Sequence, residues 1–138
     1  MKNYKILAEF IKDSSSETKD VQTYLFVKDY ISKYQLTIDI NSKLTKNKLI
    51  ELNTTLKFQD KENNEKKSYF ELIYASLIKI NENIKEKREL EKIILCDVQK
   101  QIGPNIEKVF TDLINNSGFK GVSFKNIDFE KLYNSRIN

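Results

Sequence analysis

The side chains that most often act as general bases, nucleophiles or metal ligands are scarce in this sequence. Its 138 residues contain no histidine and a single cysteine, Cys96. A Ser-His or Cys-His catalytic pair needs an imidazole, and the usual structural zinc site takes four cysteine or histidine ligands. Neither can be built within one chain of this composition. The sequence therefore argues against much of enzyme chemistry and against a metal site.

The remaining candidates for chemistry have simpler interpretations. Glu89 and Glu91 lie among lysines and are predicted to be surface charges, and Asp13 and Glu17 belong to a polar segment without an apolar pocket to shift a pKa. The serines at 14–16 have no histidine to activate them and are predicted to form a flexible loop. Three scattered glycines match no phosphate-binding loop. We therefore expect no catalytic residues and no cofactor.

The first 80 residues have the alternation that is typical of β-strands. Apolar and polar residues alternate over the predicted strands 4–11, 34–40 and 50–58. A fourth predicted strand, 68–80, is apolar on both faces, so both faces should be covered, one of them by a second subunit. The polar residues 13–20 are predicted to form a loop or an irregular edge, the polar residues 41–43 separate the second and third strands, and a solvated hairpin loop is predicted at 59–66. The run Tyr24-Leu25-Phe26-Val27 fits either a strand or a helical turn.

The last third has helical spacing. A first helix is predicted over 85–102, and Gly103-Pro104 is predicted to break it, with Pro104 as the first residue of a second helix. Gly118 suits a left-handed cap at the end of that helix. An extended crossover, 119–126, then leads to a short helix beginning near Asp128. The chain is thus predicted to be a single α+β domain over 1–138, a four-stranded antiparallel sheet followed by two main helices packed on one face.

Charge and the lone cysteine bear on location and partners. The net charge is +4 and the pI about 9.0, but the charges are dispersed in mixed runs that are typical of solvated faces. A basic nucleic-acid-binding module remains an alternative interpretation. Cys96 lies in an apolar run and is predicted to be buried. With no signal peptide and no run of about 20 apolar residues, we expect a cytoplasmic protein that does not insert into a membrane.

Several segments, in this order, resemble the SecB family of protein-export chaperones. The resemblance covers nearly the whole chain, from about Tyr4 to Tyr133. The segments that carry it are Lys12, Asp13, Ser15 and Glu17 of the Lys-Asp-x-Ser-x-Glu segment, Glu71 in the fourth strand, Gly103-Pro104-Asn105-Ile106, Ser117-Gly118-Phe119, and Asp128-Phe129-Glu130-Lys131-Leu132-Tyr133. The crossover has no proline, unlike that of the family, and most SecB chains are acidic.

The resemblance implies an assembly, a client and a partner. It implies a homotetramer built as a dimer of dimers, with strands joined edge to edge within each dimer. It implies apolar grooves that hold unfolded secretory precursors without covalent chemistry. It also implies docking onto the export ATPase SecA through acidic residues on the outer sheet face, and here these would be Asp13, Glu17 and Glu71 beside Tyr69.

Two sets of apolar residues are predicted to line the groove. They are Leu36, Ile38 and Ile40 of the second strand, and Phe119, Val122 and Phe124 of the crossover. The strand residues could equally be plain core. No ATP-binding motif is recognisable, and holding a chain by burial needs none. The alternative within the same fold is a SecB-like chaperone dedicated to one partner, such as an antitoxin.

Overall fold

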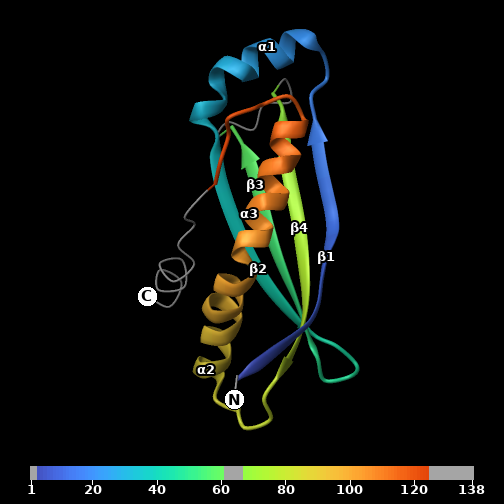
Figure 1. Cartoon of the computed structure of the whole chain (residues 1–138), viewed down its shortest axis with the longest axis vertical. Coiled ribbons are helices and arrows are strands. Elements are labelled where there is room, and N and C mark those ends of the chain that lie inside the picture. The colour runs from blue at the N-terminus through green and yellow to red at the C-terminus, as the bar shows by residue number, and fades with distance from the viewer. Residues whose placement is uncertain (1–2, 61–66, 125–138) are drawn as a thin grey trace.

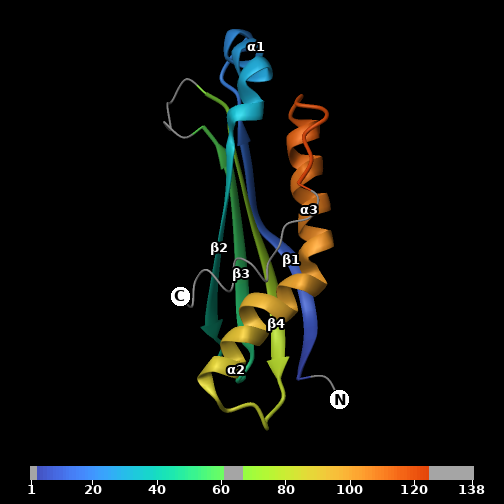
Figure 2. The same ribbon diagram turned by 90° about the vertical axis from the view of Figure 1, so that its left-hand side faces the viewer.

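The computed structural model of the chain describes residues 3–60 and 67–124. Four strands form one antiparallel sheet in the order β1-β4-β3-β2. The long C-terminal helical segment lies on one face of the sheet and leaves the other face uncovered within the described ranges (Figures 1 and 2). The elements in chain order are β1 (Tyr4–Glu17), α1 (Val21–Tyr30), the 3-10 turn η1 (Ile31–Lys33), β2 (Gln35–Leu44), β3 (Ile50–Gln59), β4 (Tyr69–Ile80), α2 (Lys87–Lys92), the π-helical turn η2 (Ile93–Asp97) and α3 (Val98–Asn116). The predicted α+β architecture is confirmed.

Strand register divides the sheet into a helix-facing side and an outer side. Phe58 pairs with Phe70, and Leu56 pairs with Leu72, so both pairs point toward the helices. These four side chains are buried, together with the helix residues that are spaced four apart and pack on them. Those helix residues are Val98, Ile102, Ile106, Phe110 and Ile114. The core of the domain is this single layer between sheet and helix.

Both edge strands are longer than the sequence predicts. β1 continues through the polar stretch to Glu17, which pairs with Tyr69, and β2 continues through Asn41–Lys43 to Leu44. Of the two interpretations of 13–20, a loop or an irregular edge, the structure shows an edge strand as far as Glu17, so the flexible loop predicted for the serines at 14–16 was wrong. An edge strand is largely open to solvent, so polar side chains do not interrupt its pairing. The predicted loop at 59–66 lies mostly outside the described residues.

The undecided run 24–27 is helical. It belongs to α1, whose first turn is capped by the Asp20 carboxylate, since Oδ1 accepts a hydrogen bond of 2.8 Å from the Thr23 amide. This backbone hydrogen bond is the main reason that the pKa of Asp20 is lowered. Val27 is the buried residue of α1. The helix closes one end of the elongated molecule (Figure 1).

The predicted break at Gly103-Pro104 is wrong, because both residues lie inside α3. Pro104 faces solvent while Ile102 and Ile106 on either side of it are buried, so packing on the sheet continues past the proline. The helical segment bends along its course (Figure 2), as expected for a helix that contains an internal proline. The regular α pattern is instead interrupted earlier, by the π-helical turn η2. Cys96 lies in this turn and is buried, as predicted.

A buried polar pair holds α3 over the middle of the sheet. Gln99 and Thr54 are both fully buried, and Gln99 Nε2 donates a hydrogen bond of 3.0 Å to Thr54 Oγ1. Breaking one partner of such a pair would leave the other without a hydrogen bond in an apolar environment. The pair therefore favours one register of the helix on β3.

The end of α3 has the cap that the sequence predicts. Gly118 has a φ of +105° and its amide donates to the Asn115 carbonyl, while the Phe119 amide donates to the Ile114 carbonyl. These two hydrogen bonds define a Schellman motif, which turns the chain back toward the sheet. The crossover is described as far as Phe124, and the short helix predicted from Asp128 lies outside the described residues.

Two buried phenols predict a loss of stability at high pH. Tyr34 donates a hydrogen bond of 2.6 Å to the Ser68 carbonyl, Tyr74 donates one of 2.8 Å to Glu9 Oε1, and burial, first among the causes, raises each pKa to about 12. The unfolded phenols titrate near pH 10. The folded state therefore binds these two protons more tightly than the unfolded state does. The stability that the two phenols contribute is complete below pH 10 and is lost between pH 10 and 12.

Urea denaturation at pH 9 and pH 11 measures this loss. The Tyr74→Phe variant should be less stable than the parent at pH 9, because the hydrogen bond to Glu9 is gone. It should lose less stability than the parent between the two pH values, because one of the two phenols no longer titrates. An unchanged loss in the variant would contradict the assignment.

Candidate functional site: an apolar margin and an acidic patch

The three predicted groove residues of β2 lie on the helix-facing side of the sheet. Leu36 pairs with Phe58, Ile38 with Leu56 and Ile40 with Thr54. Ile40 is 9% exposed and belongs to the core, whereas Leu36 and Ile38 are half-buried and pack against the core from its edge. The strand therefore contributes one core residue and two that reach the surface.

The crossover residues divide in the same way. Phe119 is 2% exposed and contacts Phe70 edge-on, with ring centroids 5.6 Å apart. Val122 and Phe124 are half-buried. Phe124 lies between Phe58 and Phe110, with centroid distances of 5.0 and 5.2 Å. The structure thus brings the crossover against the core beside β2, and leaves an apolar margin of Leu36, Ile38, Val122 and Phe124, which we call the groove margin.

Aromatic residues of α1 extend this apolar region, and sequence reasoning missed them. Phe26 stacks on Tyr30 with centroids 5.5 Å apart, and Tyr30 contacts Tyr34, which contacts Phe58. The Lys67 ammonium lies 5.0 Å from the Tyr30 ring centroid, a favourable cation–π distance. The spacing of four between residues 26, 30 and 34 is a helical signal that could have identified them.

The predicted acidic patch forms on the outer side of the sheet. Glu17 lies opposite Tyr69 in register, and the Tyr69 hydroxyl donates to the Glu71 carboxylate. Burial, this hydrogen bond and the charges of Glu71 and Asp13 raise the pKa of Tyr69. The four residues are therefore neighbours, although they come from two strands. Lys57 lies opposite Glu71 on β3 and borders the patch with a positive charge.

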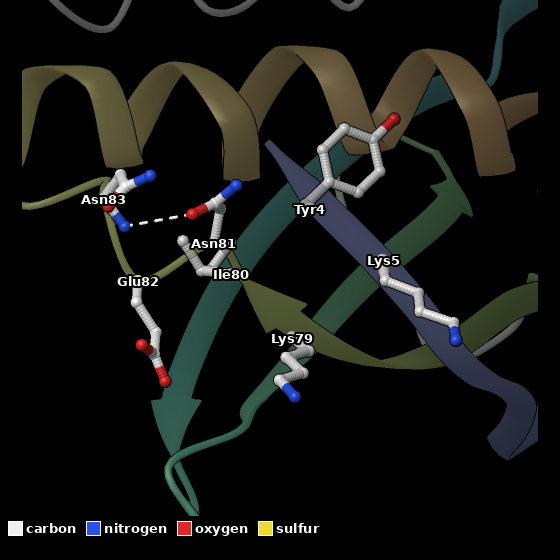
Figure 3. Close-up of a pocket in the computed structure, with 7 residues that line it drawn as sticks. All are labelled: Tyr4, Lys5, Lys79, Ile80, Asn81, Glu82 and Asn83. Carbon is white, nitrogen blue, oxygen red and sulfur yellow. Dashed lines mark hydrogen bonds between the residues drawn. The ribbon is translucent and has the colours of Figure 1, made fainter. Parts of the chain in front are cut away.

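A cavity lies at the end of the molecule away from α1. It has a volume of about 580 Å³, and its lining includes Tyr4, Lys5, Lys79 and Glu82. Figure 3 shows the Tyr4 ring directed toward the helix and both lysine ammonium groups pointing away from it. The Tyr4 hydroxyl donates to Gln101 Oε1 at 2.7 Å. This Tyr4 hydrogen bond joins β1 to α3, and the described lining holds no nucleophile with an adjacent base.

The described residues contain no group of three potential metal ligands. No helix within them has both the length and the apolar character that are needed to cross a membrane. The described residues thus present a half-buried apolar margin on the helix-facing side of the sheet and charged residues on the opposite face. By fold, the molecule is a small α+β domain with one sheet and one helical layer.

The comparisons with known proteins identify the family. The model of the SecB family, preprotein translocase subunit SecB, matches residues 1–138. A Pelagibacter ubique protein named "Putative protein-export protein SecB" is 53% identical over 99% of this chain and 98% of its own length. The chain therefore belongs to the SecB family, which is a family of protein-export chaperones and not of enzymes. The prediction of membership of the SecB family and the prediction that the protein is not an enzyme are both confirmed.

A more distant relative has the SecB name, and a solved SecB-like chaperone has the same fold. The protein-export protein SecB of Methylocella silvestris is 24% identical over 95% of this chain and 80% of its own length. The SecB-like chaperone Rv1957 of Mycobacterium tuberculosis was solved with a ChAD peptide from the Rv1956 HigA1 antitoxin. It superposes with a TM-score of 0.61 at 10% identity, over 91% of both chains, so it shares the fold.

Proposed function

We propose that this protein is a holding chaperone that binds unfolded secretory precursors along the groove margin without using a nucleotide. The observation that carries the proposal is the partial exposure of Leu36, Ile38, Val122 and Phe124, which pack on the core yet are not fully covered. Each Å² of apolar surface that a client buries contributes roughly 25 cal/mol. A long apolar contact can therefore hold a non-native chain with no single strong interaction.

Selectivity for non-native clients follows from the same physics. A folded protein keeps its large apolar side chains inside, whereas an unfolded chain exposes them in a continuous strand. Weak, distributed contacts also dissociate quickly, because most differences in affinity appear in the dissociation rate. A client could then be released without ATP hydrolysis when a stronger partner competes for it.

We further propose that the acidic patch of Asp13, Glu17, Tyr69 and Glu71 docks onto SecA. Its place on the outer side, away from the groove margin, would allow client and SecA to bind together. The Glu71→Lys variant should weaken SecA binding at least several-fold by surface plasmon resonance and leave client binding intact. The Glu82→Lys variant, in the turn that follows the opposite end of β4, is the matched control and should bind SecA normally. Equal losses in both variants would contradict a specific patch.

The assembly and location proposed here are a homotetramer, built as a dimer of dimers, in the cytoplasm. The edge strand β1 supports the assembly, since Leu7, Phe10 and Ile11 are each between 43% and 49% exposed. Exposed apolar residues on a long edge strand are a site for pairing with another chain. Sedimentation equilibrium over a range of protein concentrations tests the state directly.

The Leu36→Asp variant tests the groove margin. A charge at this position should raise the dissociation constant for an unfolded client roughly ten-fold or more, since burying one leucine contributes about 1.5–3 kcal/mol. Leu44→Asp makes the same change on the same side of the same strand, but Leu44 is 72% exposed and lies outside the margin, so client affinity should not change. Circular dichroism would verify that both variants fold. Equal effects of the two substitutions would overturn the assignment.

A further inference from the structure

A small cavity lies between α1 and the start of the crossover, where the chain leaves α3 and passes below α1 (Figure 1). Its volume is about 330 Å³. The described residues that line it are Tyr24, Lys28, Ile31, Gly118, Phe119 and Lys120. We call it the α1 pocket. Its size is at the low end for pockets that hold a ligand, which suits one large side chain rather than a long segment.

The α1 pocket is built by two local features. Tyr24, Lys28 and Ile31 have the spacing i, i+4, i+7, so they lie on one side of α1 and the turn that follows it. The cap at Gly118 turns Phe119 inward, where its ring contacts that of Tyr24 with centroids 5.1 Å apart. The Tyr24 hydroxyl donates a hydrogen bond of 2.7 Å to the Gly118 carbonyl. These contacts hold the two walls together and give the pocket an apolar floor.

The charged side chains in the described lining of this pocket have one sign. Lys28 and Lys120 are the charged residues among its described lining, and both are exposed. Neither forms an ion pair or a hydrogen bond with another described residue. Two exposed ammonium groups beside an apolar floor attract carboxylates and repel other cations, and the effect is confined to about 8 Å at physiological salt.

We infer that the α1 pocket takes one large apolar or aromatic side chain of an unfolded client and selects segments in which that residue is flanked by Asp or Glu rather than by Lys or Arg. This inference rests on the proposed function, because it assigns a preference to the same client-binding surface. An exposed ion pair changes an affinity by a factor of about 1.5 to 5. Two lysines acting on one segment should therefore give a preference of roughly five- to ten-fold.

Two fluorescein-labelled peptides of the same apolar sequence test the preference, one with Asp on both sides of a central Phe and one with Lys. The full-length protein should bind the Asp peptide roughly five-fold or more tightly at low salt, by fluorescence anisotropy, and the difference should disappear at about 0.5 M NaCl. In the Lys28→Glu/Lys120→Glu variant the preference should reverse. The control is Lys46→Glu/Lys85→Glu, which changes the net charge equally through exposed lysines outside the pocket lining.

Two outcomes would overturn the inference alone, and a third would overturn the proposed function as well. The parent protein could bind both peptides equally, or the control variant could lose the preference as fully as the pocket variant, which would trace it to net charge. If an unfolded precursor is retained while the peptides are not discriminated, only the α1 pocket inference fails. If neither the peptides nor an unfolded precursor bind, the proposed function fails with it.

Discussion

The Phe70→Ala variant should lose about 3–5 kcal/mol of its free energy of unfolding. Phe70 is fully buried at the centre of the core, where it faces Phe58 across the β3–β4 pair and Phe119 of the crossover. Truncation removes the apolar contacts of the ring and leaves a cavity that these neighbours fill only in part. Since domains of this size are stable by about 5–15 kcal/mol, the loss should be large in a urea titration.

Phe26→Ala is the matched control for that prediction. It makes the same chemical change, but Phe26 is 52% exposed and contacts mainly the Tyr30 ring. Its cost should be about 1 kcal/mol or less. Both titrations should be run at one protein concentration, because assembly contributes to apparent stability. Similar losses in the two variants would contradict the position of the core.

Gly118→Ala should cost about 3 kcal/mol, because the substitution combines backbone strain with a steric clash. A methyl group at Gly118 would lie 2.8 Å from Tyr24 Cε1, and the φ of +105° is strained for any L side chain. The Tyr24 ring would have to move, which would break its hydrogen bond to the Gly118 carbonyl. The link between α1 and the crossover would be lost with it.

Gly121→Ala separates the two causes. Gly121 also has a positive φ, of +89°, but nothing lies within 4 Å of the position that its methyl group would take. This variant should cost only the strain, about 1–2 kcal/mol. Thermal unfolding of both variants measures the difference. Equal costs would mean that Tyr24 does not pack closely on the end of α3.

Much of the fold is predictable from the sequence. The errors arise where strand pairing or packing on the sheet overrides the local sequence signal. Alternation predicted the central strands because their helix-facing residues must be apolar to be buried. The edge strands carry no such requirement at their ends, so the serines at 14–16 could not be distinguished from a loop. Gly103-Pro104 predicted a break that tertiary packing overrides, since Ile102 and Ile106 are both buried against the sheet while Pro104 points to solvent.

The sequence could predict which residues form the candidate site, but not how deeply each side chain is buried. The family resemblance placed Asp13, Glu17, Tyr69 and Glu71 together, and the strand register brings them to one side of the sheet. Periodicity alone could not separate Ile40 and Phe119, which are buried, from Leu36 and Phe124, which are half-buried. That difference depends on how closely the crossover approaches β2, which is a tertiary property. The α1 pocket likewise depends on contacts between residues about 90 positions apart, such as Tyr24 and Gly118, whose separation is 94.

Native mass spectrometry with a chemically unfolded secretory precursor tests the central claim most directly. The protein alone should appear as a tetramer. With the unfolded precursor it should appear as four subunits carrying one precursor, with no nucleotide added, and the folded precursor should form no complex. A monomer or a dimer that is indifferent to unfolded chains would contradict the assignment as a holding chaperone.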